Sequence, residues 1–223
     1  MPDKILILGG TREAALLARR LVEEGETVIT SLAGRLSSPP PLAGLVRVGG
    51  FGGVDGLAAW LADNAVTRVI DATHPFAAVI SAHAAIACAR LGLPLGRLDR
   101  PVWAKHPGDR WHWADSLDMA ARMAPGLGRR ILLTVGAGSL APFQRFGGPF
   151  YLVRVIEPPA RLAFPRHAVV VGRGPFEAAE EMALMRRFAV DLVVSKASGG
   201  AATEAKIIAA RRLGLPVLLV GRP

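Results

Sequence analysis

The segment "RLGLPLGRLDRP", residues 90–101, returns without a gap as "RLGLPVLLVGRP" at residues 212–223. Each copy follows an alanine-rich helical pattern, and each of these follows an apolar strand pattern, "VTRVIDATHPF" in the first case and "VDLVVSKASGG" in the second. Apolar stretches of strand length alternate with helical patterns along the whole chain, which favours parallel sheets of the doubly wound kind. We therefore predict two Rossmann-like α/β halves of about five strands each, joined near residues 100–106.

The repeat also sets the expected domain boundary and the expected active site. Residues 1–100 and 101–223 form the two predicted domains, with the active site in the cleft between them. The two matching terminal strands are nearly equivalent, so an exchange of these strands between the sheets stays open. Ligands of open parallel sheets bind outside the carboxyl ends of the strands. That rule predicts Thr73 and His74 on one wall of the cleft, and Lys196 and Ser198 on the other.

A simpler role is available for some of these polar residues. Asp71, Thr73 and Ser198 each stand shortly before a helical pattern, where Asp, Ser and Thr commonly cap the helix N-terminus. The sequence leaves both readings open.

The composition predicts a soluble cytoplasmic protein, and we expect a monomer, although the sequence does not reveal the oligomeric state. Hydrophobic residues make up 51% of the 223 residues, and their runs are far shorter than the roughly 20 residues that span a bilayer. The start of the chain lacks the long apolar stretch of a secretory signal. The single cysteine, Cys88, excludes an intramolecular disulfide, fits a reducing compartment, and sits among small apolar residues as core filler.

The net charge of +9 favours anionic ligands. Lysines and arginines are scattered, mostly in pairs, without a long basic run or a nucleic-acid-binding signature. Small anions are therefore preferred over nucleic acid or a membrane as partners. The five histidines are too dispersed to predict a metal site.

The first strand predicts a dinucleotide cofactor. "ILILGGTREA", residues 5–14, reads as strand, tight glycine turn and helix, in which Gly9 and Gly10 let the backbone approach a pyrophosphate. The full G-x-G-x-x-G is absent, so a purely structural turn is the alternative. The second strand ends in "VITSLAGR", with Ser31, Gly34 and Arg35 where an NAD site places an acid. This favours NADPH over NADH, unless Arg35 is only an exposed loop residue.

Seven motifs in this order resemble a known family. They are "ILILGGTREA", "DATHPFA", "RPVW…W", "LLTVGAG", "GRGPF", "SKASGG…TEAKI" and the final "LGLPV", which together cover nearly the whole chain. The sequence resembles the precorrin-6A reductase family, the NADPH-dependent reductases of the corrin pathway to cobalamin. The resemblance implies hydride transfer from NADPH to one double bond of precorrin-6A, a polycarboxylated tetrapyrrole-derived macrocycle, giving precorrin-6B. It also implies an NADPH-binding domain at residues 1–100 and a substrate domain at residues 101–223.

The residue patterns and the resemblance together lead us to expect three sets of site residues. The catalytic set is His74 and Thr73, with an orienting role preferred for His74 over proton donation. The cofactor-binding set is Gly9, Gly10, Thr11, Arg12, Glu13, Ser31, Gly34, Arg35, Asp71 and Thr73. The substrate-binding set is His74, Arg173, Lys196, Ser198, Gly199, Gly200, Thr203 and Lys206. Trp103, Trp111 and Trp113 either cover the flat face of the macrocycle or seal the junction between the halves.

Other functions stay open at this point. One is a different NADPH-dependent reductase or epimerase on the same fold, including a reductase of the cobalt-containing precorrin. The Tyr-x-x-x-Lys pair of short-chain dehydrogenases is missing, since the only tyrosine, Tyr151, is followed at the required place by Val155. The other is an NADPH sensor without enzymatic activity, which would bind NADPH and leave it unoxidised.

Overall fold

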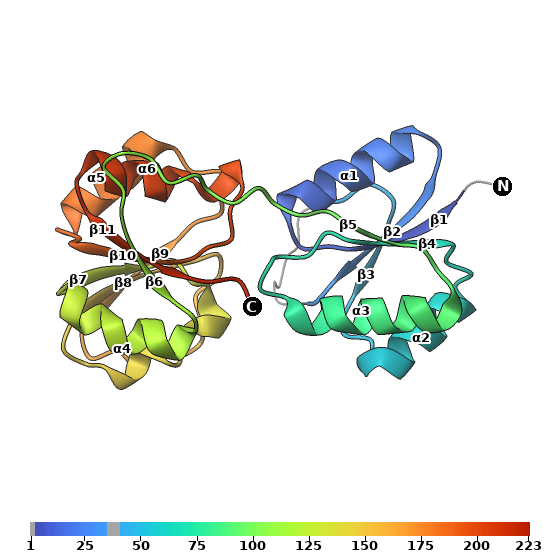
Figure 1. Cartoon of the computed structure of the whole chain (residues 1–223), viewed down its shortest axis with the longest axis horizontal. Helices are drawn as coiled ribbons and strands as arrows, with labels where there is room; N and C mark the ends of the chain where they lie inside the picture. The colour runs from blue at the N-terminus through green and yellow to red at the C-terminus, as the bar shows by residue number, and fades with distance from the viewer. Residues whose placement is uncertain (1–2, 35–40) are drawn as a thin grey trace. The chain divides into compact units, whose positions relative to one another are not determined.

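The chain divides into two compact units, Met1–Arg100 and Pro101–Pro223, in the computed structural model, which describes residues 3–34 and 41–223. Each unit is built on one sheet of parallel strands with helices on both faces (Figure 1). The predicted fold class, two Rossmann-like doubly wound units, is confirmed.

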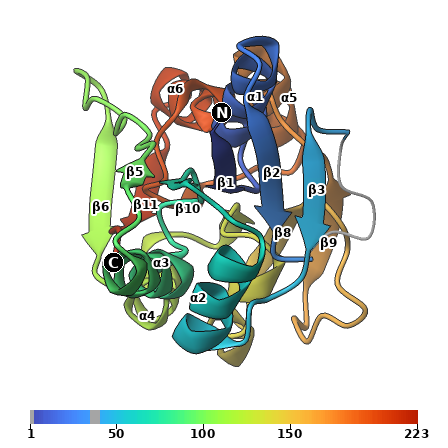
Figure 2. The ribbon, with the colours of Figure 1, turned by 90° about the vertical axis from the view of Figure 1, so that its right-hand side faces the viewer.

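Sheet A of the first unit has the strand order β3-β2-β1-β4-β5, and every neighbouring pair is parallel. Its strands are β1 (Lys4–Leu8), β2 (Thr27–Leu32), β3 (Leu45–Val48), β4 (Arg68–Asp71) and β5 (Leu95–Arg97). Its helices are α1 (Arg12–Glu23), α2 (Gly53–Asp63) and α3 (Ala78–Leu91). Helix α1 covers one face of the sheet and α2 and α3 cover the other, while Figure 2 shows β2 and β3 running side by side in one direction.

Helix α1 shows why the local sequence folds as expected. The Thr11 hydroxyl oxygen accepts the Ala14 N–H and so caps the first turn. Ala14, Ala18 and Leu21 are buried at helical spacing and pack with the strand β1 residues on that face of sheet A. The apolar residues of α1 therefore form one buried face.

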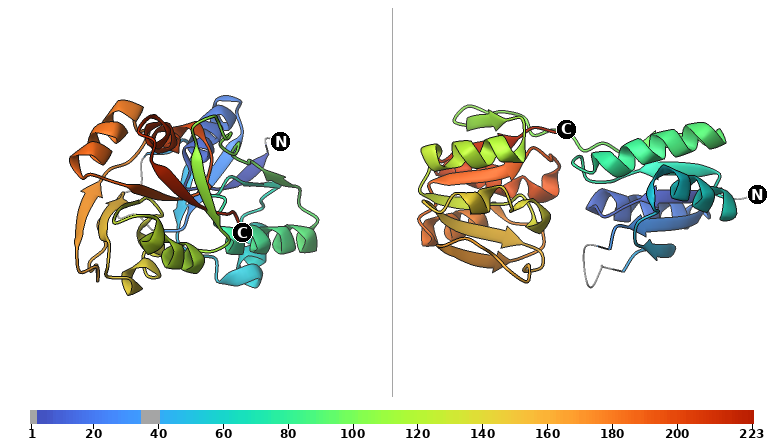
Figure 3. Two further views of the ribbon diagram at one scale, coloured as in Figure 1. Left: turned by 60° about the vertical axis from the view of Figure 1, so that its left-hand side comes forward. Right: turned by 90° about the horizontal axis from the view of Figure 1, so that it is seen from below.

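Sheet B of the second unit has the strand order β6-β11-β10-β7-β8-β9, again with parallel neighbours throughout. Its strands are β6 (Arg110–Ala114), β7 (Arg130–Leu133), β8 (Phe150–Val155), β9 (His167–Val171), β10 (Leu192–Lys196) and β11 (Pro216–Val220). Its helices are α4 (Leu117–Leu127), α5 (Ala178–Arg187) and α6 (Ala205–Arg212), with the 3₁₀ turns η1 (Ala137–Ser139), η2 (Phe143–Arg145) and η3 (Ala201–Thr203). In Figure 3, α5 and α6 lie on one side of these strands and α4 on the other.

The sequence repeat corresponds to a repeated topology. The order β9-β8-β7-β10-β11 in sheet B matches β3-β2-β1-β4-β5 in sheet A. The repeated segments form β5 and β11, and each of these strands pairs within the sheet of its own unit. No exchange of terminal strands is present between the two sheets.

Strand β6 is an addition that the sequence analysis missed. It pairs with β11 at the edge of sheet B, so this sheet has six strands instead of the expected five or so. Its sequence, RWHWA, lacks the aliphatic run by which the other strands were recognised. The strand signal in this sequence is the alternation of Trp111 and Trp113 with polar neighbours, because both tryptophans then point to one face of the sheet.

The helices are short, and their apolar faces pack on the sheets. Helix α3 has 14 residues and buries Ala84, Ala87 and Cys88 against sheet A. Burial raises the pKa of the Cys88 thiol, which fits its expected role as core filler. Within residues 3–34 and 41–223, no helix is long and apolar enough to cross a membrane.

Candidate functional site

Each sheet has one switch point, where the strand order reverses direction. It lies between β1 and β4 in sheet A and between β7 and β10 in sheet B. Ligands of open α/β sheets bind in the crevice outside the carboxyl ends of the strands at such points. Most of the predicted site residues follow β1, β2, β4 or β10, at the carboxyl ends of these strands.

The turn after β1 is open and firmly held. A Cβ at Gly9 would lie 2.7 Å from the Thr30 side chain on β2, so that position needs glycine. Gly10 has a φ of 99° and nothing within 4 Å of where its Cβ would be. The Thr11 hydroxyl donates to the carbonyl oxygen of Ala72 at 2.8 Å, which ties the turn to the end of β4. The turn therefore offers bare backbone beside the start of α1, as a pyrophosphate requires.

Two charged residues follow in the first turn of α1. Arg12 is exposed, and the Glu13 carboxylate is bound by the Arg100 guanidinium at 2.7 Å. The ion pair offsets a negative charge that would otherwise repel an anion at this helix N-terminus. Both residues of the predicted cofactor set therefore lie beside the glycine turn.

The guanidinium of Arg47, a residue of β3, lies at the end of β2, and the sequence did not predict it as a site residue. Ser31 is buried, and its hydroxyl accepts a hydrogen bond from the Arg47 guanidinium at 3.2 Å. Arg47 also donates to the carbonyl oxygens of Gly49 and Gly50, both at 2.6 Å, and lies over the Phe51 ring at 3.7 Å. Burial lowers the pKa of this guanidinium from its usual value. Among the residues that the structure describes, no carboxylate pairs with Arg47.

The cation predicted from the sequence for the end of β2 is Arg35. Gly34 is exposed just after β2, and Arg35 lies outside the described residues. Arg47 is 16 residues from Ser31 in the chain and reaches it because β2 and β3 pair with Ser31 beside Arg47. Only that strand pairing, which no local motif encodes, could have identified it.

The tip of β4 is stabilised by its own side chains. Asp71 is 4% exposed and accepts hydrogen bonds from the Thr73 hydroxyl at 2.7 Å and the Thr73 N–H at 3.1 Å. Arg97 lies 3.7 Å from the other carboxylate oxygen. Helix α3 begins after Ala77, without a side-chain cap. Asp71 and Thr73 therefore shape the turn at the switch point and do not cap that helix.

His74 stands next in the same turn with a fixed tautomer. Its Nδ1 accepts the Phe76 N–H at 3.2 Å, so in the neutral ring the proton is on Nε2. Nε2 is then a hydrogen-bond donor, which suits an orienting role. Across the described part of the chain, no three His, Cys, Asp or Glu side chains gather as a metal site would need.

The switch point of sheet B pairs a lysine with a serine. Lys196, the last residue of β10, donates to the Ser139 hydroxyl at 2.7 Å. Ser139 belongs to the 3₁₀ turn η1 that follows β7. Ser139 follows the "LLTVGAG" motif and was not among the predicted site residues. An ammonium and a hydroxyl side by side suit a carboxylate ligand.

The loop after β10 is held from several sides. Gly199 has a φ of 67°, and a Cβ there would collide with the carbonyl oxygen of Pro101. The Thr203 hydroxyl donates to the Gly199 carbonyl at 3.1 Å, and the Trp103 indole N–H donates to that of Gly200 at 3.1 Å. The loop is therefore a rigid wall of the second unit.

Three of the remaining predicted residues differ in their surroundings. Ser198 is buried in this loop and does not cap α6, whose N-cap residue is Glu204 and which has no side-chain cap. Lys206 is 4% exposed, donates to the Thr203 carbonyl at 2.5 Å and lies 4.6 Å from the Trp103 ring centre. Arg173 is exposed beyond the end of β9, the edge strand. The structure thus brings Lys196 and Ser139 together and buries Lys206. Arg173 is exposed next to Gly174, where a Cβ would lie 3.0 Å from the carbonyl oxygen of Ala202 in η3.

A buried ion pair in the second unit was also missed. Arg154 on β8 is bound by Glu181 on α5, and both side chains are less than a tenth exposed. The Arg154 guanidinium also lies 4.1 Å from the Phe176 ring centre, in the "GRGPF" motif. Burial lowers the pKa of Arg154, and Glu181 opposes that shift. The pair anchors the loop after β9 to the core.

Charge is divided very unequally between the units. Residues 101–223 carry 17 of the 27 Lys and Arg residues and 9 of the 18 acidic ones, hence +8 of the net +9. Residues 1–100 are nearly neutral. An anion with many charges is therefore attracted chiefly to the second unit.

The chain is similar to proteins of one kind along its whole length. The family model described as "Precorrin-6x reductase CbiJ/CobK" matches residues 4–223. Precorrin-6A reductase of Rhodococcus erythropolis is 47% identical over 99% of this chain and 89% of its own length. Cobalt-precorrin-6A reductase of Salmonella typhimurium is 30% identical over 98% of this chain and 87% of its own length. The solved structure titled "CobK precorrin-6A reductase" superposes with a TM-score of 0.95 at 42% identity, covering 100% of this chain and 89% of that one.

Proposed function

The chain belongs to the precorrin-6x reductase family CbiJ/CobK, and from this premise we propose that it reduces precorrin-6A with NADPH as hydride donor. Family membership makes it an oxidoreductase of cobalamin biosynthesis. The observation that carries the cofactor is the arrangement in the first unit: an open glycine turn at the start of α1 with a guanidinium beside Ser31.

The metal-free macrocycle is the favoured substrate. Five relatives named precorrin-6A reductase are 42–47% identical to the chain. Three named cobalt-precorrin-6A reductase are 28–31% identical. The difference supports precorrin-6A without cobalt.

The first unit, residues 1–100, is the proposed NADPH domain. The main chain at Gly9 and Gly10 and the start of α1 would hold the pyrophosphate, with Arg12 beside it. Ser31 and Arg47 would hold the 2′-phosphate of the adenosine ribose, which NADH lacks. NADPH supplies the hydride when bound. His74 and Thr73, fixed by Phe76 and Asp71, would orient the reacting groups through a hydrogen bond that His74 Nε2 donates and one that the Thr73 hydroxyl oxygen accepts.

The second unit, residues 101–223, is the proposed substrate domain. Its net charge of +8 supports binding of a macrocycle with many carboxylates. Lys196 and Ser139 would hold one of those carboxylates at the switch point, beside the rigid loop of Ser198, Gly199 and Gly200. Thr203 and Lys206 would act indirectly by holding that loop.

The reaction is tested by anaerobic incubation of the purified protein with NADPH and precorrin-6A. The expected result is loss of NADPH absorbance together with a gain of two hydrogens in the mass of the macrocycle. Cobalt-precorrin-6A and NADH serve as parallel substrate and cofactor, and both should react more slowly. Flat absorbance and unchanged mass with folded protein would refute the proposed function.

A further inference from the structure

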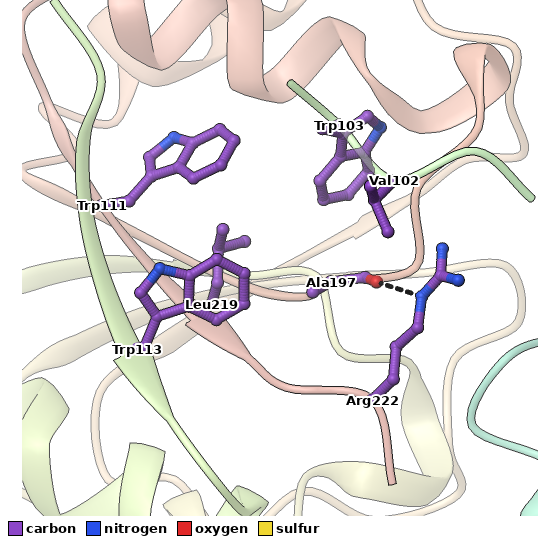
Figure 4. A pocket seen from close by; sticks show the side chains of 7 residues that line it. All are labelled: Val102, Trp103, Trp111, Trp113, Ala197, Leu219 and Arg222. Atoms are coloured by element: carbon purple, nitrogen blue, oxygen red, sulfur yellow. Dashed lines mark hydrogen bonds between the residues drawn. The ribbon is translucent and has the colours of Figure 1, made fainter. Parts of the chain in front are cut away.

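The second unit contains a small pocket with aromatic walls. Its volume is about 150 Å³, and it is lined by Val102, Trp103, Trp111, Trp113, Ala197, Leu219 and Arg222 (Figure 4). The Arg222 guanidinium donates to the carbonyl oxygens of Ala197 and Ser198, both at 3.1 Å, and so stands at the pocket beside the loop after β10. Three of the four tryptophans of the chain meet here.

The three tryptophans are not equivalent. Trp103 is 8% exposed, and its N–H is bound to Gly200, so it is a structural wall. Trp111 packs on the core beneath α5 and α6 and meets Trp113 edge-on, with ring centres 6.1 Å apart. Trp113 is 53% exposed. A large aromatic side chain held in place yet half open to water is typical of a binding surface.

The position of the pocket also indicates a ligand. Ala197 directly follows β10, Leu219 lies near the end of β11, and Trp113 lies near the end of β6. All three strands are parallel, so the pocket opens at the carboxyl edge of sheet B, where α/β proteins bind ligands. The same edge carries Lys196 and the rigid loop with Gly199.

We propose that this pocket takes one pyrrole-derived ring at the periphery of precorrin-6A, stacked on Trp113. A cavity of about 150 Å³ accepts a group the size of benzene, so it fits one ring of the macrocycle and not the whole. The flat conjugated ring suits an indole face, and the basic second unit suits the carboxylates that such a ring carries. The inference rests on the proposed function and names a subsite that fixes the orientation of the substrate.

The test compares Trp113→Ala, Trp113→Phe and Val169→Ala with the wild type. Val169 is a matched control, because it is an exposed apolar residue on β9, at the opposite edge of sheet B. Binding of precorrin-6A is measured without NADPH from the quenching of tryptophan emission, and NADPH is titrated separately. Trp113→Ala should raise the Kd for precorrin-6A roughly tenfold, or about 1.4 kcal/mol. Trp113→Phe should recover most of the affinity, while Val169→Ala and every NADPH titration should stay within about twofold of wild type.

Steady-state kinetics give the second readout. Trp113→Ala should raise KM for precorrin-6A with little change in kcat, because the ring binds the substrate away from the reacting carbon. An unchanged Kd and KM in a variant that folds, alongside an active wild type, would overturn the subsite and leave the proposed function standing. Equal losses for NADPH and precorrin-6A would also overturn it. A wild type that neither binds nor reduces precorrin-6A would remove both proposals.

Discussion

The same corner of the two sheets carries an arginine in both units, but from different strands. By the repeat and the strand register, Ser31 of β2 occupies the position equivalent to Arg154 of β8. Arg47 of β3 occupies the position equivalent to Val170 of β9. In the first unit Arg47 reaches over to Ser31 and donates to neutral carbonyl oxygens. In the second unit Arg154 is buried against the carboxylate of Glu181. Among the described residues, the corner in the first unit holds a cation without a carboxylate partner, while the corner in the second unit pairs its cation with a buried carboxylate.

The segments that follow β1 and β7, the equivalent strands of the two units, also differ. In the first unit the 12-residue helix α1 begins directly after the glycine turn, with Thr11 as its cap. In the second unit β7 is followed by two short 3₁₀ turns, and the polar groups at the switch point are the side chains of Lys196 and Ser139. The two units thus share one sheet topology and differ in the loops that follow equivalent strands, and under the proposed function these loops separate the dinucleotide site from the substrate site.

The largest expected effect on the free energy of unfolding comes from removing one partner of the buried ion pair between Arg154 and Glu181. Glu181→Leu leaves the Arg154 guanidinium buried without its carboxylate and should lower the free energy of unfolding by about 3–5 kcal/mol. The double variant Arg154→Met/Glu181→Leu should regain most of that loss, because it removes both charges together. Ser31→Ala, at the matching place in the first unit, should cost about 1 kcal/mol or less. Urea unfolding of the four proteins measures this, and equal small losses for Glu181→Leu and Ser31→Ala would contradict it.

The second expected effect is on cofactor choice. Arg47→Ala should weaken NADPH binding roughly 10- to 100-fold, since a charge-assisted hydrogen bond is worth about 1.5–3 kcal/mol. NADH binding should barely change, because NADH has no 2′-phosphate. Arg90→Ala is a matched control, as that exposed arginine pairs with Asp55 on the surface of the same unit. Equal losses of NADPH and NADH affinity in Arg47→Ala would show that Arg47 does not bind the 2′-phosphate. A loss of NADPH affinity in Arg35→Ala and not in Arg47→Ala would assign the 2′-phosphate to Arg35, the residue predicted from the sequence.

The third expected effect separates the two switch points. Lys196 occupies the place that Ala72 holds in the repeat, so only the second unit presents a side-chain cation there. Lys196→Ala should raise KM for precorrin-6A about tenfold, less at high salt because salt screens exposed charges beyond about 10 Å. Lys105→Ala, another lysine of the second unit, should leave KM unchanged. A change in NADPH affinity as large as that in KM would make Lys196 a structural or cofactor residue.

Local patterns predicted the elements of the fold well. The apolar run of β1, the glycine turn and the stripe of α1 all lie within one stretch of chain, so sequence alone identified them. The repeat located the equivalent strands β5 and β11. Strand β6 escaped because its apolar residues are two tryptophans alternating with polar neighbours.

The candidate site depends on pairings that local patterns do not reveal. Arg47 joins Ser31 only through the register of β2 and β3. The tryptophan pocket assembles residues from the segment before β6, from β6, from the loop after β10, from β11 and from the C-terminal segment. Lys206 looked like a substrate ligand in sequence, but its helix turns the side chain inward to Thr203 and Trp103. The cytoplasmic location and monomeric state inferred from composition stay predictions.

The smallest expected effect concerns a third difference between the units, Tyr151. It stands in β8 where the first unit has Val28 in β2, and it is fully buried. Its hydroxyl has no hydrogen-bond partner among the described residues, and burial raises its pKa to about 12. Tyr151→Phe keeps the ring and removes the unsatisfied hydroxyl, so it should raise the free energy of unfolding near pH 7 by about 1 kcal/mol.

The pH dependence gives this last prediction a definite sign. Above about pH 10 the unfolded tyrosine loses its proton, while the folded one keeps it until about pH 12. The unfolded state then binds fewer protons, so wild-type stability falls by about 1.4 kcal/mol per pH unit across that window. Tyr151→Phe lacks this slope, and its advantage should therefore widen between pH 10 and 12 in urea unfolding. Because Tyr151 is the only tyrosine, absorbance titration of the folded protein reports on it alone, and ionisation near pH 10 would show that the hydroxyl reaches water after all.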